Sequence, residues 1–496
     1  MTEYIDIPPF LWYNTARCVH RRIMATKYIF PYEVKHNMNI KKLIGNKAFY
    51  KTVLAITIPI IIQNGITSFV NLLDNVMVGR LGTEQLSGVG IANQLIFVFT
   101  LCLFGGLAGA GIFTAQFFGK GDHEGLRYSV RFKLYTALAI LAVGGVILIP
   151  FGEDLITLFL TEGDTTGDVA LTLFFGREYL KISLVSLVPM CLSMVYASTL
   201  REAGRTVPPM VASIAAVAAN ALFNWLLIFG IGPFPALGVV GAAWGTVIAR
   251  VLELLILVIW SHASIKKVPY FKGLYRSPRI PLDLCKQIFV KSLPLMVNEL
   301  FWSSGMTILN QCYSTRGLVA VAAVNIAVTV ANVFNIVYMS MGSAVAIIVG
   351  NQLGAGEIEE AKDTDRKIIA FSCVLCTVIG GIMAAMAPIF TVFYNVTQDV
   401  KDLAAVMIIV YAVMMPFSSF AHNCYFTLRS GGKTLITFLF DSAYVWAISV
   451  PTGLLLSRFT GLPIIPLFAI CAALELGKCV IGLLMLRSGK WAKKLV

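Results

Sequence analysis

The chain has 496 residues, of which 57% are hydrophobic and only 13% are charged. An ordinary soluble domain carries about 25% charged residues, and its helices need a polar face. This composition therefore excludes a soluble protein and predicts a chain embedded in lipid. The net charge of +13 does not indicate nucleic acid binding, because the basic residues are spread along predicted loops, as Lys and Arg are in the cytoplasmic loops of membrane proteins.

Residues 1–51 are polar and basic and contain no signal peptide. Met38 begins a segment that resembles a natural start, so residues 1–37 are either a dispensable extension or lie upstream of the true start. Cys373 and Cys376 form a CxxC inside an apolar run without a second pair, and we interpret the thiols as reduced packing residues. No histidines have metal-ligand spacing, and we expect neither a resident metal nor a cofactor.

Apolar runs of about 20 residues, the length that crosses a bilayer, predict membrane-spanning helices along the rest of the chain. The twelve candidates are residues 52–73, 86–115, 134–152, 180–200, 209–230, 239–261, 292–313, 320–349, 368–389, 404–427, 434–457 and 462–486. The segment GIGPFPALG separates two of them, because Gly and Pro favour a turn.

The basic residues orient these spans. With the N-terminus inside, the inner segments hold 31 Lys and Arg and the outer segments hold 6, which fits the cytoplasmic excess of positive charge. The outer segment GEDLITLFLTEGDTTGD is acidic. We therefore expect both termini to face the cytoplasm.

The two halves of the chain are related. A shift of 235 residues aligns Pro59 with Pro294, Gly82 with Gly317, Gly119 with Gly354, Gly121 with Gly356 and Arg131 with Arg366, and a shift of 228 superposes LREAGRT (200–206) on LRSGGKT (428–434). Each half holds an even number of spans, so the repeat is parallel. It predicts two lobes around a central cavity that rock to give alternating access.

The predicted fold class is thus an all-α integral membrane protein of twelve transmembrane helices in two parallel six-helix repeats. The predicted parts are a basic cytoplasmic segment (1–45), an N-lobe (46–265), a cytoplasmic linker (266–289), a C-lobe (290–486) and a cytoplasmic tail (487–496).

Four motifs resemble the multidrug and toxic compound extrusion (MATE) family, and within it the NorM-like branch. They are PIIIQNGITSFVNLLDNVMVGRLG (59–82), LREAGRTVPPM (200–210), PALGVVGAAWGTVIAR (235–250) and LRSGGKT (428–434). The resemblance covers roughly residues 45–490. It implies the two-lobed fold and a transporter that exports cationic drugs and toxins in exchange for H⁺ or Na⁺.

Asp74, near the outer end of the first span, is the main candidate for ion coupling. An ionised group inside a membrane is costly and needs a partner, a wet cavity or a function. Asp74 is either a cavity carboxylate that alternately holds and releases H⁺ or Na⁺, or a carboxylate that caps an interfacial turn. The resemblance favours the first and implies that Asn220, Asn224 and Thr246 complete the site. Asn224 departs from the DinF-like branch, which has aspartate there, so the ion stays open.

Glu299 in the seventh span is the second candidate for coupling. NorM-like relatives pair a glutamate in this span with an aspartate in the tenth, but here the tenth span has no acid. The resemblance thus implies an incomplete C-lobe ion site, and Glu299 instead contacts the cationic substrate or is a hydrogen-bonded structural residue.

The other charges inside spans have structural interpretations. Arg250 with Glu253, and Glu475 with Lys478, have i,i+3 spacing and can pair on one helix face. His422 is expected to be a buried neutral histidine rather than a titrating group, and Asp441 stays unassigned. Aromatic, Met and amide side chains can line a cavity for organic cations, although they more often serve packing. The cavity candidates are Gln63, Met77, Asn298, Trp302, Tyr338 and His422.

The favoured function is a monomeric antiporter of the bacterial plasma membrane, with small organic cations as substrates and lipid as its surroundings. The first alternative is a flippase for lipid-linked precursors from the same superfamily, which the acidic or neutral cavity candidates argue against. The second is a receptor or scaffold that transports nothing, which would leave the repeat and the unpaired acids without a purpose. No phosphate loop, HExxH or nucleophile motif supports an enzyme.

Overall fold

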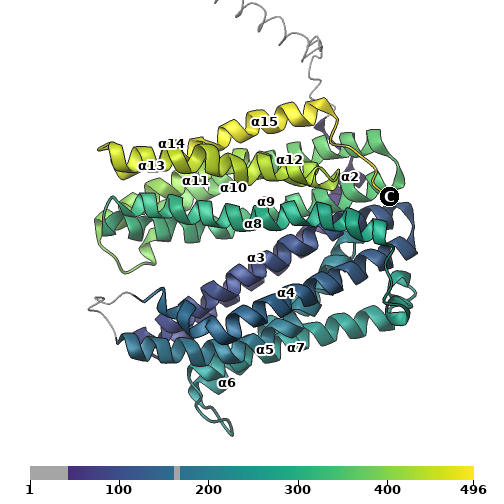
Figure 1. Cartoon of the computed structure of the whole chain (residues 1–496). Coiled ribbons are helices and arrows are strands. Elements are labelled where there is room, and N and C mark those ends of the chain that lie inside the picture. Colours follow the sequence, from purple (N-terminus) through teal and green to yellow (C-terminus); the bar gives the residue numbers. More distant parts are fainter. Residues whose placement is uncertain (1–42, 161–167) are drawn as a thin grey trace, which may run out of the picture. The chain divides into compact units, whose positions relative to one another are not determined.

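The computed structural model describes residues 43–160 and 168–496, and within these residues every regular element is a helix (Figure 1). The question of where the natural chain starts concerns residues 1–37, which lie outside the described residues.

The twelve predicted spans all coincide with long helical segments that extend several residues beyond most of the apolar runs. The first six are α2 (Lys47–Gly79), α3 (Thr83–Lys120), α4 (His123–Thr157), α5 (Val169–Glu202), α6 (Val207–Phe229) and α7 (Val239–Ala263). The next four are α8 (Leu282–Ser314), α9 (Leu318–Ala355), α10 (Ile358–Val392) and α11 (Gln398–Ser430). The eleventh span comprises α12 (Thr434–Phe438), two π-helical turns η4 (Leu439–Ala443) and η5 (Val445–Ser449), and α13 (Val450–Phe459), and the twelfth comprises α14 (Ile464–Ala473) and α15 (Glu475–Ser488).

Eleven of these segments in the described part of the chain are long and apolar enough to cross a membrane. The exception is α8, which has 33 residues but carries Asn298, Glu299 and several Ser residues in its central turns. Its length matches its neighbours, and its polarity comes from residues that the sequence marks as functional. Together with the structural relatives described below, this confirms the predicted helical membrane fold.

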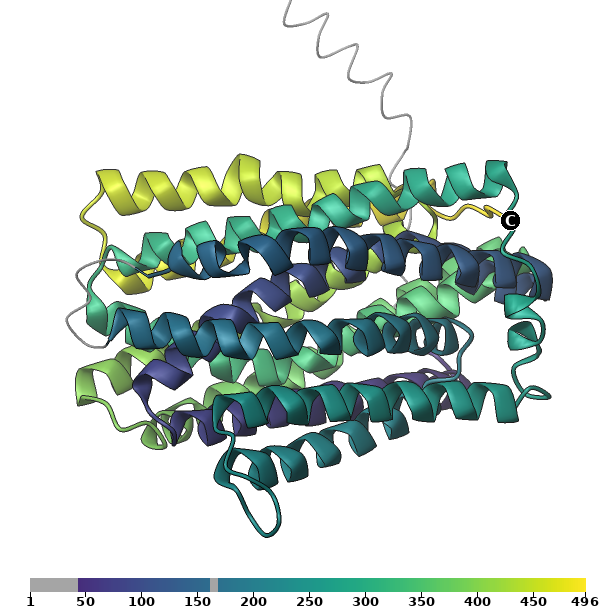
Figure 2. The ribbon, with the colours of Figure 1, turned by 60° about the horizontal axis from the view of Figure 1, so that its bottom comes forward.

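The helices form two groups, α2–α7 and α8–α15 (Figures 1 and 2). Helix α2 contacts both, because it packs on α6 of the first group and on α9 of the second. Helix α3 packs on α4 and α5 in the first group and on α8 and α9 in the second, while α9 packs on α10 and α11. Each group has its own apolar core, one around Leu103, Leu187 and Leu200 and one around Ala327, Met407 and Leu467. The boundaries of the two lobes remain predictions.

The loop between α7 and α8 includes two short 3₁₀ turns, η2 (Pro269–Phe271) and η3 (Leu274–Arg276). It packs against α4, where the Arg131 guanidinium donates to the carbonyl of Leu274 at 2.8 Å and to that of Arg279 at 3.1 Å. The loop that joins the two helix groups is therefore held against the first group.

The repeat is visible in the backbone. Helices α3 and α9 both end at a glycine in the left-handed region, Gly121 (φ 75°) and Gly356 (φ 90°). Gly204 and Gly432, which follow α5 and α11, have φ values of 70° and 71°. L residues rarely adopt this conformation and glycine does so without a steric cost. The glycines that align in the sequence therefore end equivalent helices.

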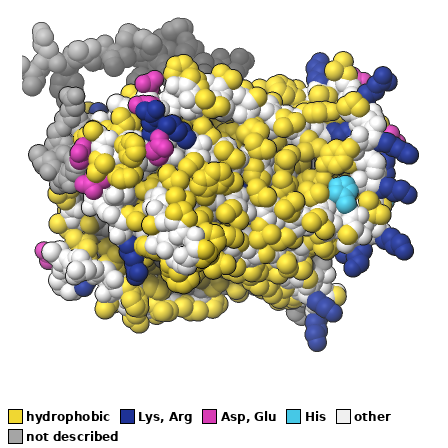
Figure 3. Space-filling view, turned by 90° about the horizontal axis from the view of Figure 1, so that it is seen from below, with side chains coloured by type: hydrophobic (Ala, Val, Ile, Leu, Met, Phe, Trp, Pro, Cys, Tyr) yellow, Lys and Arg dark blue, Asp and Glu magenta, His cyan; other side chains and the backbone are white. Residues whose placement is uncertain are grey.

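The type of exposed side chain changes along the direction of the helix axes. Figure 3 shows hydrophobic side chains over a broad middle zone, Lys and Arg gathered at one end, and most of the visible Asp and Glu at the other. The basic end includes the α7–α8 loop, in which Lys266, Lys267, Lys272, Arg276 and Arg279 are exposed. A chain in water could not expose such an apolar zone, so the middle zone is the surface that lipid would cover.

Candidate functional site

Asp74 lies five residues before the end of α2 and faces α6 and α7. The Asn224 Nδ2 donates to its Oδ1 at 2.7 Å. With its amide nitrogen turned toward the carboxylate, Asn220 donates to both Asp74 oxygens, at 2.8 and 3.0 Å. The Thr246 hydroxyl lies 3.4 Å from the Asn220 amide. The four residues that the sequence analysis combined are therefore in one hydrogen-bonded cluster.

Local sequence explains this cluster. Asn220 and Asn224 are one turn apart on α6, so both amides project from the same face, and both are buried, with exposed fractions of 6% and 1%. On α7, Gly245 leaves the space that the Asn224 side chain occupies, because an added Cβ would overlap Asn224 Oδ1. That oxygen is buried and has no hydrogen-bond partner among the described residues. It is an unused acceptor beside a carboxylate.

A second series of hydrogen-bonded polar side chains connects the same three helices, α2, α6 and α7. Gln63 of α2 donates to the Ser213 hydroxyl at 2.7 Å, and Ser213 donates to Glu253 at 2.8 Å. Glu253 pairs with Arg250 at 2.9 Å. This confirms the predicted pairing of Arg250 with Glu253. It also places Gln63, a cavity candidate, in a structural network.

In the second helix group, Glu299 of α8 accepts a hydrogen bond of 3.1 Å from the Tyr425 hydroxyl of α11. Its stem lies against α3 of the first group, since a Cβ added at Gly105 would be 3.1 Å from Glu299 Cγ. Glu299 is therefore at the contact between the two helix groups. No hydrogen bond joins it to Asp74 within the part of the chain that the structure describes.

Asn298, the residue before Glu299, connects to a buried charge cluster. It donates to Asp441 at 3.0 Å, and it accepts a bond of 2.7 Å from the Ser442 hydroxyl. Asp441 in turn pairs with Lys478 at 3.0 Å, and Lys478 pairs with Glu475 at 3.2 Å. The predicted Glu475–Lys478 pair is present, but it is part of a triad rather than an isolated pair.

The sequence analysis left Asp441 unassigned and missed its link to Lys478. Asp441 lies within the π-helical turn η4, and such turns often occur at functional positions. The sequence did contain an indication of this pairing, because Asp441 and Lys478 have opposite charges and lie on consecutive, antiparallel spans. It was overlooked because only pairs on the same helix face were considered.

The remaining cavity candidates pack among apolar and aromatic side chains. The His422 ring lies 5.3 Å from that of Tyr338 and 5.0 Å from that of Phe426, measured between centroids. Met77 packs against the apolar cluster around Val78 and Val89, and Trp302 against Leu309 and Val445. These contacts place His422 and Tyr338 side by side, away from Met77.

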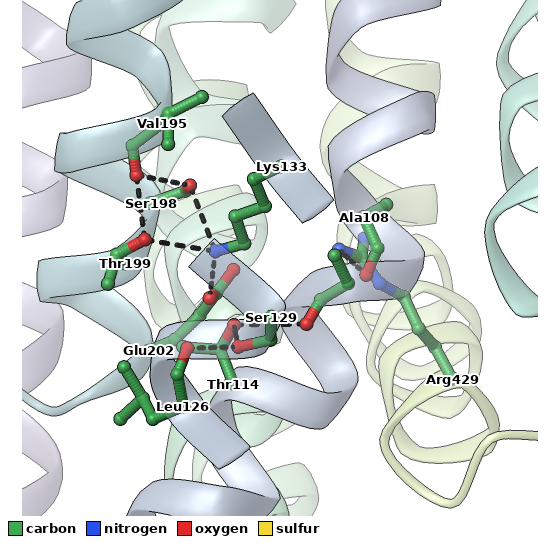
Figure 4. Close-up of polar contacts among 11 residues, drawn as sticks. Ala108, Thr114, Leu126, Ser129, Lys133, Val195, Ser198, Thr199, Glu202 and Arg429 are labelled. Carbon is green, nitrogen blue, oxygen red and sulfur yellow. Dashed lines mark hydrogen bonds and ion pairs between the residues drawn. The ribbon is translucent and has the colours of Figure 1, made fainter. Parts of the chain in front are cut away.

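Figure 4 shows a buried ion pair that the sequence analysis did not identify. Lys133 of α4 is fully buried and forms an ion pair with Glu202 at the end of α5. Its ammonium also donates to Ser198 at 3.2 Å and to Thr199 at 3.4 Å. Lys133 lies just before the predicted third span (134–152), whereas α4 begins ten residues earlier, at His123, and includes it.

These features define the class of the protein as a polytopic helical membrane protein with charged and amide groups between its helices. The family model described as MatE matches residues 59–226 and again residues 294–457. The two matches begin 235 residues apart, the same shift that aligns the two halves of the sequence. The chain therefore belongs to the MATE family of membrane transporters, as its motifs predicted, and it is a transporter rather than an enzyme.

Curated relatives cover most of the chain. It is 28% identical over 421 residues to "Probable multidrug resistance protein NorM" of Halalkalibacterium halodurans, covering 83% of this chain and 88% of that protein. It is 25% identical over 409 residues to "Multidrug resistance protein PmpM" of Pseudomonas aeruginosa, covering 82% of this chain and 84% of that protein.

Solved structures share the fold. One described as the outward-facing conformation of a multidrug resistance MATE family transporter has a TM-score of 0.78 at 18% identity, covering 92% of this chain and 99% of that chain. Another, described as MATE in the bent conformation, has a TM-score of 0.79 at 19% identity and covers the same shares.

Proposed function

We propose that this chain is a secondary antiporter that exports small organic cations in exchange for H⁺ or Na⁺. The names of its relatives, which include multidrug resistance proteins of two organisms, support a role in drug efflux. The two helix groups act as the N-lobe and C-lobe, and alternating access comes from their movement relative to each other. A single positive charge moving inward contributes about 2.3 kcal/mol per 100 mV, and a monovalent organic cation moving outward costs the same amount. A one-for-one exchange is therefore driven by the concentration gradient of the coupling ion, at about 1.4 kcal/mol per tenfold ratio.

The hydrogen-bonded carboxylate of Asp74 is the observation that carries this proposal. Its hydrogen-bond partners on α6 are neutral amides, and no Lys or Arg forms an ion pair with it in the described part of the chain. Binding of H⁺ or Na⁺ neutralises the Asp74 carboxylate. Its hydrogen bonds with Asn220 and Asn224 then become weaker, and so does the attraction between α2 and α6. An ion can shift a conformational equilibrium only by such a difference between states.

The donor set also accommodates Na⁺. Carboxylate, amide and hydroxyl oxygens are the ligands that hard cations prefer, and Asn224 Oδ1 is a buried acceptor without a partner among the described residues. Rotation of the two amides would present their oxygens to the ion together with Asp74 and Thr246. Protonation of Asp74 alone would serve an H⁺-coupled cycle, so the experiment below has separate H⁺ and Na⁺ arms.

Glu299 is the residue we assign to the organic cation. It lies where α8 of the second group meets α3 of the first, and its one hydrogen-bond partner among the described residues, Tyr425, is neutral. A carboxylate and an aromatic ring together attract an organic cation. Because these groups are acidic and aromatic, they favour a cation over the pyrophosphate head group of a lipid-linked precursor.

We place the protein in the plasma membrane with its basic end and both termini in the cytoplasm. The basis is the concentration of Lys and Arg at one end of the molecule (Figure 3), since cytoplasmic loops carry the excess of positive charge. One chain contains both helix groups, so the monomer is the unit that we expect to function.

The test is efflux of ethidium from proteoliposomes that contain the wild type or Asp74→Asn, with H⁺ and Na⁺ gradients applied separately. We expect the wild type to respond to one of the two ions and Asp74→Asn to lose at least about 90% of that stimulation. The effective ion identifies the coupling. A matched control is Asp154→Asn, because Asp154 is an exposed acid near the same outer end of the same helix group but outside the Asp74 cluster.

Equal loss in Asp154→Asn would show that the effect is not specific to Asp74. If the folded wild type moves no organic cation under either gradient, the antiport proposal is wrong, and assays with lipid-linked substrates would test the flippase alternative.

A further inference from the structure

A groove opens on the surface of the first helix group, between the first turns of α2, the start of α6 and the end of α7. Its volume is about 350 Å³, and its walls include Ala55, Val207, Val211 and Ile256. Val207 and Val211 expose 52% and 49% of their surface. Ala55 also lines a second hollow of about 570 Å³, whose lining residues all belong to α2. The two hollows thus meet at one residue.

Both hollows are bordered by cations. Arg205 and Lys267 line the first, and Lys47 and Lys51 line the second. All four side chains are exposed, and none forms an ion pair with another residue in the described part of the chain. Among the described residues, no Asp or Glu lines either hollow. The edge of an apolar groove therefore carries a local excess of positive charge.

Further features of the groove indicate what would fill it. Helix α6 begins at Val207, so the positive end of its dipole is directed at the groove. Trp260 of α7 lines the wall, and Trp side chains favour the boundary between hydrocarbon and head groups. Lys267 belongs to the exposed basic loop between α7 and α8. Apolar walls below a ring of cations match a molecule with an anionic head and hydrocarbon chains.

We propose that this groove binds one anionic phospholipid, with its phosphodiester between Arg205 and Lys267 and an acyl chain along the furrow between α2 and α6. Basic pockets between helices at the cytoplasmic side are suited to anionic head groups. A free phosphate would use the cations but not the exposed apolar walls, which is why we assign the groove to a lipid. The proposal depends on membrane insertion with the basic end inside, and not on the transported substrate or the coupling ion.

The position of the groove gives the lipid a structural consequence. It touches the beginnings of α2 and α6, the helices that carry Asp74 and its two amide partners. The Thr206 hydroxyl donates to the Ala55 carbonyl at 3.5 Å, which is the direct polar bridge between the two helices at this end. A lipid bound across the same point would add to this long hydrogen bond and help to hold the first turns of the two helices together.

The experiment measures binding of phosphatidylglycerol and phosphatidylcholine to the delipidated full chain in detergent by native mass spectrometry, with glycerol phosphate as the probe for free phosphate. We expect one phosphatidylglycerol to bind about tenfold tighter than phosphatidylcholine. Arg205→Gln combined with Lys267→Gln should remove that preference. The control, Lys272→Gln combined with Lys286→Gln, removes two exposed cations of the same end that do not line the groove, and should retain it.

Ala55→Phe separates the groove from general surface attraction, because it fills the hollow without changing any charge. It should weaken phosphatidylglycerol binding about as much as the double cation variant. Three outcomes would each overturn the proposal. They are unchanged phosphatidylglycerol binding in Ala55→Phe, an equal loss of the lipid preference in the control variant, and glycerol phosphate binding as tight as that of the lipid. Thermal unfolding of each variant without lipid shows whether it is folded, and the antiport assay above is read separately.

Discussion

Individual acids between the helices fall into two kinds. Glu202, Glu253, Asp441 and Glu475 each pair with a Lys or Arg. Asp74, Glu299 and Asp365 are bound only by neutral amide or hydroxyl groups in the described structure. A paired charge is neutralised within the protein, whereas an acid with neutral partners still attracts a cation. This difference separates the residues that hold the helices together from those that can exchange an ion or bind a substrate.

Lys133→Met tests the first kind. Because Lys133 is fully buried and Glu202 is its ionic partner, the substitution leaves a carboxylate without compensation, and loss of one member of a buried pair costs about 3–5 kcal/mol. We expect a clear drop in the midpoint of thermal unfolding. Lys133→Met combined with Glu202→Gln should recover much of the loss, since no unpaired charge remains.

The two unfolding midpoints are compared with that of Lys272→Met, which removes an exposed cation and should change little. An unchanged midpoint in Lys133→Met would mean that water or another group compensates Glu202.

The sequence predicted the Asp74 cluster because its members have a recognisable spacing within family motifs. Hydropathy could not predict the burial of Lys133, because a single Lys next to an apolar run looks the same whether it ends a loop or lies inside a helix. The Asp441–Lys478 pair depends on the register of two neighbouring helices, and no local rule supplies that register.

At the scale of helices, α3 and α9 meet in a reciprocal contact. A Cβ added at Gly119 would overlap the carbonyl of Asn351, and one added at Gly354 would overlap the carbonyl of Gln116. The shift of 235 relates Gly119 to Gly354 and Gln116 to Asn351. Each helix thus presents the same glycine to the same position of the other, so the contact has the self-complementary form of a two-fold interface. It joins the two helix groups at their basic end.

Gly119→Ala should open this contact, because the new methyl group meets backbone, which cannot rotate away. We expect the distance between spin labels at Lys120→Cys and Glu357→Cys, two exposed positions of α3 and the start of α10, to increase and broaden. The control is Gly90→Ala, which lies in the same helix and has open space around it. A label distance that is the same in both variants would mean that the two helices adjust without separating.

The helices themselves were predictable to within a few residues at α6 and α7, where turns rich in Gly and Pro limit the apolar runs. The end of α3 and the beginning of α4 were not predictable in this way. Polar turns extend α3 beyond its apolar run to Lys120, and polar turns before the apolar run of α4 begin at His123. Hydropathy identifies only the part of a helix that lipid can surround, and these polar turns lie outside that part. The aligned glycines were visible in the sequence, but their contact across the two groups required the fold.

For the whole molecule, the basic end is also where the last segment of the chain crosses from one helix group to the other. Trp491, which follows α15, is buried against the C-terminal side of α11. Leu495 packs among Ala108, Ile112 and Leu295, in the region between α3 and α8. The reciprocal glycine contact and this segment together hold the groups in contact at the end that we place in the cytoplasm. The two groups are therefore in contact at this end, and the alternating access that we propose would require both contacts to open.

Gln116 is the residue that fastens this segment. Its Nε2 donates to the carbonyls of Ser430 and Lys493, at 3.0 and 3.2 Å, and its Oε1 accepts from the Leu495 amide at 2.7 Å. Gln116→Leu keeps the approximate volume and leaves these buried backbone groups unpaired, each at a cost of about 1–3 kcal/mol. We expect the segment to detach, so that trypsin cleaves at Lys493 and Lys494 several times faster and the labels at Lys120→Cys and Glu357→Cys move apart.

The control is Gln398→Leu, which replaces an exposed glutamine of α11 and should change neither the cleavage rate nor the label distance. Faster cleavage without a change in the label distance would show that the glycine contact alone keeps this end closed, whereas a change in both would make the segment part of the gate.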